Sequence, residues 1–215
     1  MKNRKIIIVV RILIAMIIVG VLASLPSKED TTIPLVIKKD NITFEYGEKL
    51  PDEIAGYKEV LDYSKVPDDE IENIQISIDV KNATITTTNE DGSQSEIEAD
   101  YPEVGEYPIA FLYDHTVATT DVIIVDTTKP KLTVPKNIKI VQGTDLSTFD
   151  FKSLFSASDL SKLSDYTIDF SSVDINKPAE YTIKVSIMDQ YQNKAEKDVK
   201  VTVIPLSEVA ANKVN

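Results

Sequence analysis

Apolar and polar residues alternate with a period of two along much of the chain after residue 31. The clearest runs are Ile74–Val80, Tyr181–Ile187 and Val199–Val203. This period places the apolar side chains on one face of a β-strand. The polar segment Asp189–Lys194 joins the last two runs and suits a turn, which predicts an antiparallel hairpin. The sequence therefore predicts an all-β fold whose strands have one buried and one solvated face.

Landmark residues recur along the chain at two different spacings. Gly47 and Gly143 are 96 residues apart, whereas Tyr107 and Tyr181 are 74 apart. The difference of about 22 residues indicates two copies of one unit, the first of which carries an insertion. An Asp91-Gly92 pair between β-prone runs predicts a hairpin turn inside that insertion. We therefore expect two tandem sandwich domains, at residues 32–126 and 128–205, with an extra hairpin near residues 80–101.

The N-terminal 26 residues have a different pattern, that of a targeting segment. A basic start is followed by the apolar run Ile12–Ala23 and by small residues, as in a cleaved signal peptide. The alternative is an uncleaved transmembrane anchor, because Ile6–Leu25 is twenty residues long and sufficient to span a bilayer. Both alternatives predict an N-terminal apolar helix and an exported chain, either secreted or held on the outer face of the cytoplasmic membrane. Residues 206–215 are expected to form a disordered tail.

Composition narrows the class of protein further. The chain has no cysteine, which excludes disulfides, thiolate zinc sites and cysteine nucleophiles. An exported sandwich without disulfides favours a bacterial envelope protein. The formal net charge of -12 would repel nucleic acid and anionic membrane. Such a surface most commonly serves solubility, and the alternative is that it attracts cations or basic partners.

Four motifs in the second repeat resemble those of the bacterial Ig-like domains of the group-3 type, which occur in surface proteins and beside insecticidal crystal toxins. They are, in order, an Asp-Thr-Thr-x-Pro linker at 126–130, a Thr-Ala-x-Asp-like turn at Ser156–Asp159, a Lys-Pro-Gly-x-Tyr strand entry at 177–181 and an Asp-x-x-Gly-Asn turn at 189–193. Two glycines of the pattern are replaced, by Ala179 and Gln192, and the resemblance covers residues 128–205 clearly and 32–126 weakly. It implies an Ig-like β-sandwich used in adhesion or as a spacer, without catalytic residues.

Catalytic chemistry has little support in the sequence. No nucleophile elbow, phosphate-binding loop or dinucleotide-binding turn occurs, and His115 is the single histidine. A lone histidine after a strand, beside Asp114, is most often a solvated polar residue. We expect a protein that is not an enzyme and that uses no cofactor.

Three carboxylates at loop-like positions form one candidate metal site, namely Asp126, Asp159 and Asp189. Oxygen-rich loops between tandem sandwiches suit calcium, which prefers six to eight oxygen ligands. The alternative is that these are separate, solvated loop acids. Both interpretations stay open at this point.

Function is expected on the inserted hairpin, since loops on a rigid scaffold carry binding. The candidate binding residues are Thr86, Thr88, Asn89, Asp91 and Gly92. They predict adhesion or binding to a protein or glycan at the cell surface, with membrane contact through the N-terminal segment if it is uncleaved. A passive spacer at the envelope is one alternative, and an enzyme of unrecognised class is another.

Overall fold

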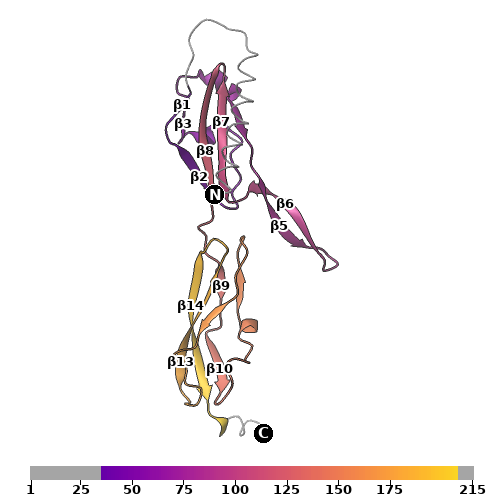
Figure 1. Cartoon of the computed structure of the whole chain (residues 1–215), viewed down its shortest axis with the longest axis vertical. Coiled ribbons are helices and arrows are strands. Elements are labelled where there is room, and N and C mark those ends of the chain that lie inside the picture. Colours follow the sequence, from indigo (N-terminus) through magenta and orange to yellow (C-terminus); the bar gives the residue numbers. More distant parts are fainter. Residues whose placement is uncertain (1–34, 208–215) are drawn as a thin grey trace, which may run out of the picture. The chain divides into compact units, whose positions relative to one another are not determined.

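The computed structural model describes residues 35–207, and the chain divides into two compact units between Val125 and Asp126. The expected signal peptide or membrane anchor at residues 1–26 and all but the first two residues of the expected tail lie outside the described residues. Among the residues that are described, no helix is long and apolar enough to cross a membrane. Each unit is treated by itself below (Figure 1).

Unit 1 is built from a four-stranded sheet and a two-stranded sheet. The larger sheet has the order β2-β8-β7-β4, in which β2 runs parallel to β8 and the other pairs are antiparallel. The smaller sheet pairs β1 with β3. The strands are β1 (Val36–Ile37), β2 (Asn41–Glu45), β3 (Leu61–Asp62), β4 (Gln75–Ile78), β7 (Gly105–Tyr113) and β8 (Thr116–Val125). Two 3-10 helices, η1 (Ile54–Tyr57) and η2 (Asp68–Asn73), complete this layer arrangement.

The core of unit 1 lies between its two sheets. The alternating residues of β7 and β8 supply its centre, where Ile109, Phe111 and Val122 are fully buried. Tyr57 of η1 packs on Phe111 with ring centroids 5.4 Å apart, so the 3-10 helix covers the face that the small sheet leaves open. Burial of such side chains stabilises each by roughly 1.5–3 kcal/mol.

Unit 2 repeats this topology strand for strand. Its larger sheet has the order β10-β14-β13-β12, in which β10 runs parallel to β14 and the other pairs are antiparallel. Its smaller sheet pairs β9 with β11. The strands are β9 (Lys131–Thr133), β10 (Asn137–Val141), β11 (Ser156–Ser158), β12 (Thr167–Asp169), β13 (Glu180–Met188) and β14 (Lys194–Ile204), with η3 at Lys152–Leu154. The prediction of an all-β architecture with two sandwich-like units is confirmed for residues 35–207.

One local prediction from the sequence was wrong. Ser156–Ser158 was expected in a turn but forms strand β11, because its backbone pairs with β9. Strand β12 ends at Asp169, and beyond it the amide of Val173 donates a 2.9 Å hydrogen bond to the carbonyl of Phe170 and closes a turn.

Matching contacts fix the correspondence between the two units. The hydroxyl of Tyr107 donates to the carbonyl of Glu103 at 2.9 Å, and that of Tyr181 donates to the carbonyl of Lys177 at 2.9 Å, each four residues earlier. Gly47 and Gly143 follow β2 and β10 with φ of 95° and 81°. This is the left-handed region, which glycine adopts at no steric cost.

Strand register then locates the insertion. Ile78 lies opposite Ile109 in unit 1, and continuing the β12 register places Phe170 opposite Ile183, which is the counterpart of Ile109. In unit 2 only Ser171 and Ser172 separate Phe170 from Val173. In unit 1 the equivalent connection, from Ile78 to Ala99, contains twenty residues. These residues include most of a further antiparallel pair, β5 (Asn82–Thr88) and β6 (Gln94–Pro102).

Candidate functional site

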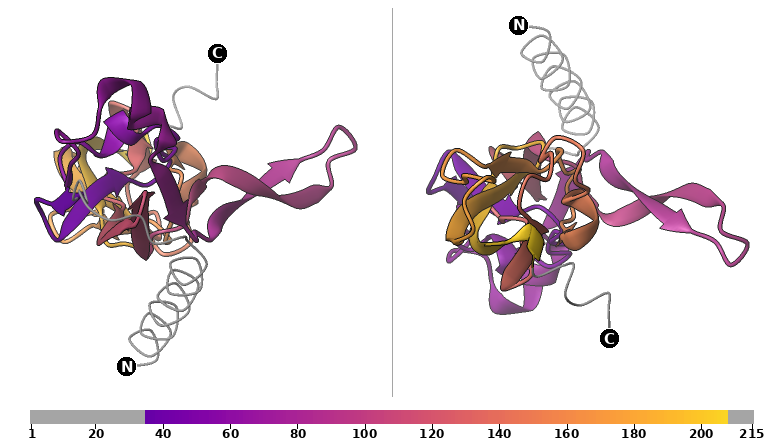
Figure 2. Two further views of the ribbon diagram at one scale, coloured as in Figure 1. Left: turned by 90° about the horizontal axis from the view of Figure 1, so that it is seen from above. Right: turned by 90° about the horizontal axis from the view of Figure 1, so that it is seen from below.

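The β5–β6 hairpin is the main difference of unit 1 from its repeat, and it extends away from the sandwich (Figures 1 and 2). Its register pairs Ile85 with Ile97 and Thr86 with Glu96. It forms a sheet of two strands to which no other strand of residues 35–207 is paired. Both outer edges therefore carry backbone groups without a strand partner, a feature that allows pairing with another chain.

The hairpin root is held by an apolar contact and an ion pair. Ala83 and Ala99 are buried at the point where the hairpin leaves the sandwich. Beside them, the Lys81 ammonium lies 2.8 Å from both carboxylate oxygens of Glu103, and the Glu103 amide donates to the Lys81 carbonyl at 2.8 Å. The hairpin thus has a fixed base and a free outer half.

The hairpin tip is a turn built by three of the candidate binding residues. The Ser93 amide and hydroxyl donate to Asp91 Oδ1 at 2.9 and 2.6 Å, and Asn89 Nδ2 donates to Ser93 Oγ at 2.9 Å. Gly92 has φ of 82°, which a side chain would strain. The hydrogen bonds from Ser93 hold the pKa of the Asp91 carboxyl below its usual value. Asn89, Asp91 and Gly92 therefore shape the tip, whereas Thr86 is exposed on the strand that leads to it; Thr88 pairs with Gln94 in the same ladder.

The hairpin is acidic at its tip and along its second strand, β6. Between Asn82 and Pro102 it contains five carboxylates and no lysine or arginine; they are Glu90, Asp91, Glu96, Glu98 and Asp100. A surface with one sign of charge attracts partners of the opposite sign and speeds their association.

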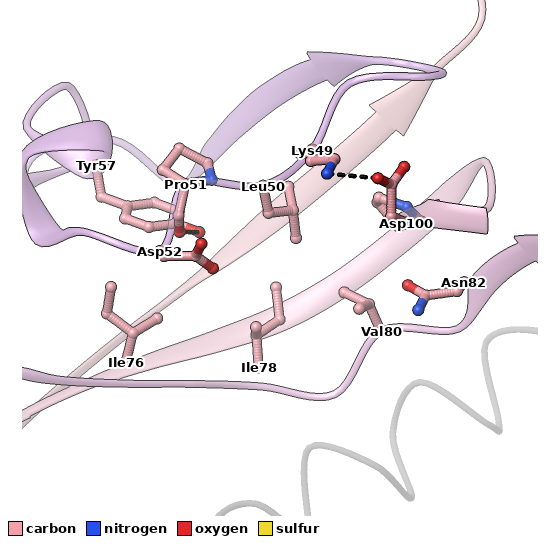
Figure 3. Close-up of a pocket in the computed structure, with 11 residues that line it drawn as sticks. Lys49, Leu50, Pro51, Asp52, Tyr57, Ile76, Ile78, Val80, Asn82 and Asp100 are labelled. Carbon is pink, nitrogen blue, oxygen red and sulfur yellow. Dashed lines mark hydrogen bonds and ion pairs between the residues drawn. The ribbon is translucent and has the colours of Figure 1, made fainter. Parts of the chain in front are cut away.

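A pocket of about 460 Å³ lies where the hairpin joins the sandwich (Figure 3). We call it the base pocket. One wall is formed by Ile76, Ile78 and Val80, which follow one another at every second position along and just after β4. The facing wall consists of Leu50, Pro51 and Tyr57, and Asn82 and Pro102 of the hairpin also line it. The pocket is therefore shared between the scaffold and the insertion.

Charged groups lie at the rim of the base pocket. The Lys49 ammonium forms an ion pair with the Asp100 carboxylate, which raises the pKa of Lys49 and lowers that of Asp100. Both side chains are exposed, so this pair contributes little stability. Asp52 also lines the pocket, and within residues 35–207 its carboxylate makes no ion pair or hydrogen bond. It is a fixed negative charge beside an apolar surface.

Tyr57 connects the pocket wall to the core. Its hydroxyl donates to the Pro51 carbonyl at 3.0 Å, and burial together with the nearby Asp52 charge raises its pKa to about 12. Gly56 leaves room for Pro51 to fold over this helix, because a Cβ at position 56 would overlap the proline ring. The wall is thus preformed by the backbone.

The same place in unit 2 is filled by aromatic side chains. Phe170, the counterpart of Ile78, packs on Phe151 with ring centroids 4.6 Å apart, and Phe151 packs on Phe149 at 4.4 Å. In unit 1, a smaller isoleucine stands at that position and the connection beyond it leaves as the hairpin. The pocket follows from these two sequence differences.

The three carboxylates proposed from the sequence come together in unit 2. Oxygen atoms of Asp126, Asp159 and Asp189 all lie within 4.8 Å of one another. Asp189 is only 5% exposed, which does not match separate, solvated loop acids. Calcium binding itself stays a prediction.

Hydrogen-bond donors already serve this acidic cluster. Asn193 Nδ2 donates to Asp189 Oδ2 at 2.7 Å and to the Asp126 carbonyl at 2.9 Å, and its amide donates to Asp189 Oδ1 at 2.9 Å. The Ser161 hydroxyl donates to Asp126, and its amide donates to Asp159 Oδ1 at 2.8 Å. The cluster therefore closes one end of unit 2 through side-chain hydrogen bonds.

His115 occupies the two-residue turn between β7 and β8. Its Nε2 lies 3.6 Å from Asp114 Oδ1, and its side chain is 27% exposed. Asp114 has φ of 48°, as turn residues of this type often do. Both residues form the turn that joins the two strands.

Comparison with known proteins gives structural neighbours alone. No family model and no curated protein matches the chain. Among solved structures, it is similar to human mucin-like protocadherin EC1-2 (16% identity, TM-score 0.30, covering 81% of this chain and 100% of that one). It is also similar to protocadherin gamma B7 cadherin domains 1–4 (13%, 0.28, 80% and 51%) and to Drosophila N-cadherin EC1-4 (15%, 0.25, 61% and 41%). The chain thus spans about half of the gamma B7 structure. Similarity at this level does not identify a function.

Sequence reasoning found the hairpin and missed the base pocket. Its far wall comes from the irregular segment Lys49–Tyr57, which has no periodic pattern to read. Strand register sets Ile78 against Phe170, and the smaller side chain at this half-buried position leaves space beside the core.

Proposed function

We propose that this chain is a non-enzymatic bacterial protein, exported to the cell surface or secreted, whose first unit binds a protein or glycan partner through the β5–β6 hairpin. The observation that carries the proposal is the hairpin itself. It is an acidic two-stranded projection, with exposed edges and a structured tip, added to a sandwich whose second copy lacks it. Loops presented by a rigid scaffold are where binding functions concentrate.

Two features of the sequence support the cellular setting in this proposal. The motifs at residues 126–130, 177–181 and 189–193 resemble those of bacterial Ig-like domains, and the N-terminal apolar segment suits export. The units then act as the scaffold, and binding depends on surface complementarity rather than on a reaction.

The proposal is tested by removing the hairpin without removing its scaffold. Residues 79–98 are replaced by Ser-Ser, the connection that unit 2 uses between Phe170 and Val173. The labelled full chain and this variant are compared for binding to bacterial cells and to arrays of glycans and surface proteins. We expect binding to fall at least tenfold in the variant, while circular dichroism keeps the β spectrum. Equal binding by the two proteins would contradict the proposal.

A passive spacer is the second candidate, and the strand-for-strand repetition of the two units is the observation that favours it. In that case the full chain binds nothing on cells or arrays, and the hairpin-replaced variant is indistinguishable from it in every assay.

A further inference from the structure

We propose that the base pocket and the adjacent free edge of β4 bind an extended, basic segment of a partner protein, with one aromatic side chain of that segment inserted into the pocket. This inference rests on the proposed function, because it assigns the partner chemistry for the region where the hairpin meets the sandwich. The site differs from the hairpin tip and uses other residues.

The pocket walls define the group that enters. Ile76, Ile78 and Val80 face Leu50, Pro51 and Tyr57 across a space of about 460 Å³, which is in the range of sites that hold organic groups (Figure 3). Polar atoms gather at the rim, at Lys49, Asp52 and Asp100. The bound group is therefore expected to be apolar in the part that lies inside the pocket and polar in the part that remains at the rim.

Unit 2 shows which apolar group suits this place in the fold. There, Phe170 stands at the register position of Ile78, and its ring packs 4.6 Å from that of Phe151. Unit 1 lacks this ring but keeps the surrounding sandwich. An aromatic side chain from a second chain would occupy in unit 1 the place that Phe170 has in unit 2.

The edge of β4 supplies main-chain pairing for the segment that carries the ring. Strand β4 is the last strand of its sheet and pairs with β7 alone among the described strands. Alternate backbone groups of an edge strand point outward and can accept an added strand. The residues of β4 that line the pocket are Ile76 and Ile78, so an added strand would lie beside the opening.

Charge selects a basic segment. Within residues 35–207 the Asp52 carboxylate makes no ion pair or hydrogen bond, and it lies on the pocket rim; the nearby Lys49 ammonium is itself paired with Asp100. Besides Asp100, which is paired with Lys49, the neighbouring hairpin adds four carboxylates and no basic residue. Lysine or arginine side chains next to the inserted ring would meet negative charge on both sides.

The test uses the full chain with isotope-labelled methyl groups and three octapeptides that differ in one feature each. The first alternates threonine with lysine and has a central phenylalanine. In the second, alanine replaces that phenylalanine; in the third, glutamate replaces the lysines. We expect the first peptide to shift the methyl signals of Ile76, Ile78 and Val80, with a dissociation constant on the order of 0.1 mM. The second and third are expected to bind at least about tenfold more weakly, as loss of a buried ring or of charge attraction requires.

Two variants separate the pocket from general attraction to an acidic protein. Ile78→Phe places in unit 1 the ring that unit 2 has, so it should reduce binding of the first peptide at least about tenfold while the melting temperature does not fall. Asp52→Asn removes the unpaired charge from an exposed position and should weaken the lysine-containing peptides. Asp40→Asn is its matched control, because it makes the same charge change in unit 1 outside the pocket, and it should leave the affinity unchanged.

Several results would overturn the inference. These are equal affinity of the phenylalanine and alanine peptides, wild-type affinity in Asp52→Asn, or no binding by any peptide. Signal shifts limited to Thr86–Ser95 would also overturn it, while leaving the hairpin proposal in place. Conversely, peptide binding in the pocket by a full chain that binds nothing on cells or arrays would reject the hairpin proposal alone.

Discussion

Units 1 and 2 use one topology, but each is elaborated at a different place. After the fourth equivalent strand, unit 2 closes its sandwich with Phe170 and a two-residue connection, whereas unit 1 opens into the hairpin and the base pocket. At the last hairpin, unit 2 has the longer connection instead. Unit 1 has the two-residue turn Asp114-His115, and unit 2 has the longer turn that carries Asp189 and Asn193. The comparison teaches that the shared core tolerates change wherever a connection leaves the sheet.

The largest expected effect concerns the aromatic cluster of unit 2. Phe170→Ala should destabilise unit 2 by about 2–4 kcal/mol, because it removes a half-buried ring that packs on Phe151. Ile78→Ala at the equivalent position should cost unit 1 only about 1 kcal/mol, since the side chain already borders open space. Hydrogen exchange of β7 and β13 amides reports the two units separately. Equal losses of stability in the two variants would show that positions 78 and 170 do not differ in packing.

The acidic cluster gives the next largest effect. Asn193→Ala removes a side-chain donor to Asp189, which is 5% exposed, and to the Asp126 carbonyl. We expect a loss of about 1–3 kcal/mol in the unfolding free energy of unit 2. Asn176→Ala is the matched control on an exposed position and should change stability by less than about 0.5 kcal/mol. Urea unfolding of both variants provides the measurement.

Calcium addition tests the metal prediction on the same cluster. If the three carboxylates bind calcium, millimolar calcium raises the melting temperature of unit 2, and Asp159→Asn removes this rise. Unit 1 is the internal control and should not respond. An unchanged melting temperature for unit 2 would mean that hydrogen bonds alone organise the cluster.

A smaller effect comes from two turn residues with positive φ. Gln192 has φ of 73° and stands where the resembling family has glycine. Gln192→Gly should stabilise unit 2 by about 0.5–1 kcal/mol, because relief of left-handed strain exceeds the added entropy of the unfolded chain. Asp114→Gly in unit 1 should bring almost no gain, since aspartate tolerates this region better. Thermal unfolding of both variants checks the difference, and a destabilised Gln192→Gly would contradict it.

The smallest effect is a pH dependence in unit 1. The pKa of Tyr57 is raised from an ordinary value of 10.0 to about 12. A raised folded-state pKa gives stability that is fully present below pH 10 and is lost as the pH rises toward 12, because the unfolded state releases its proton first. Unfolding of the wild type and Tyr57→Phe at pH 8 and 11 should show a steeper decline for the wild type. Parallel declines would contradict the assignment to Tyr57.

The parts that the sequence predicted are those with a periodic pattern or a repeated landmark. Alternation located β4, β13 and β14, and the spacing of Tyr107 and Tyr181 located the insertion. The segment Lys49–Tyr57 was not predictable in this way, since its conformation depends on the fit of Pro51 over Gly56 and of Tyr57 under the sheet. The three aspartates were chosen only as loop residues. Their common position depends on hydrogen bonds from Asn193 and Ser161, and no local sequence pattern predicts these contacts.

The parallel pairs β2–β8 and β10–β14 have a mechanical consequence. Asn41–Glu45 lies beside Asp121–Val125, and Asn137–Val141 lies beside Lys200–Ile204. Tension applied through the two ends of either unit therefore runs along both strands of the pair. Their hydrogen bonds are loaded together in shear instead of being peeled apart singly, so each unit should resist pulling more strongly than its modest size suggests.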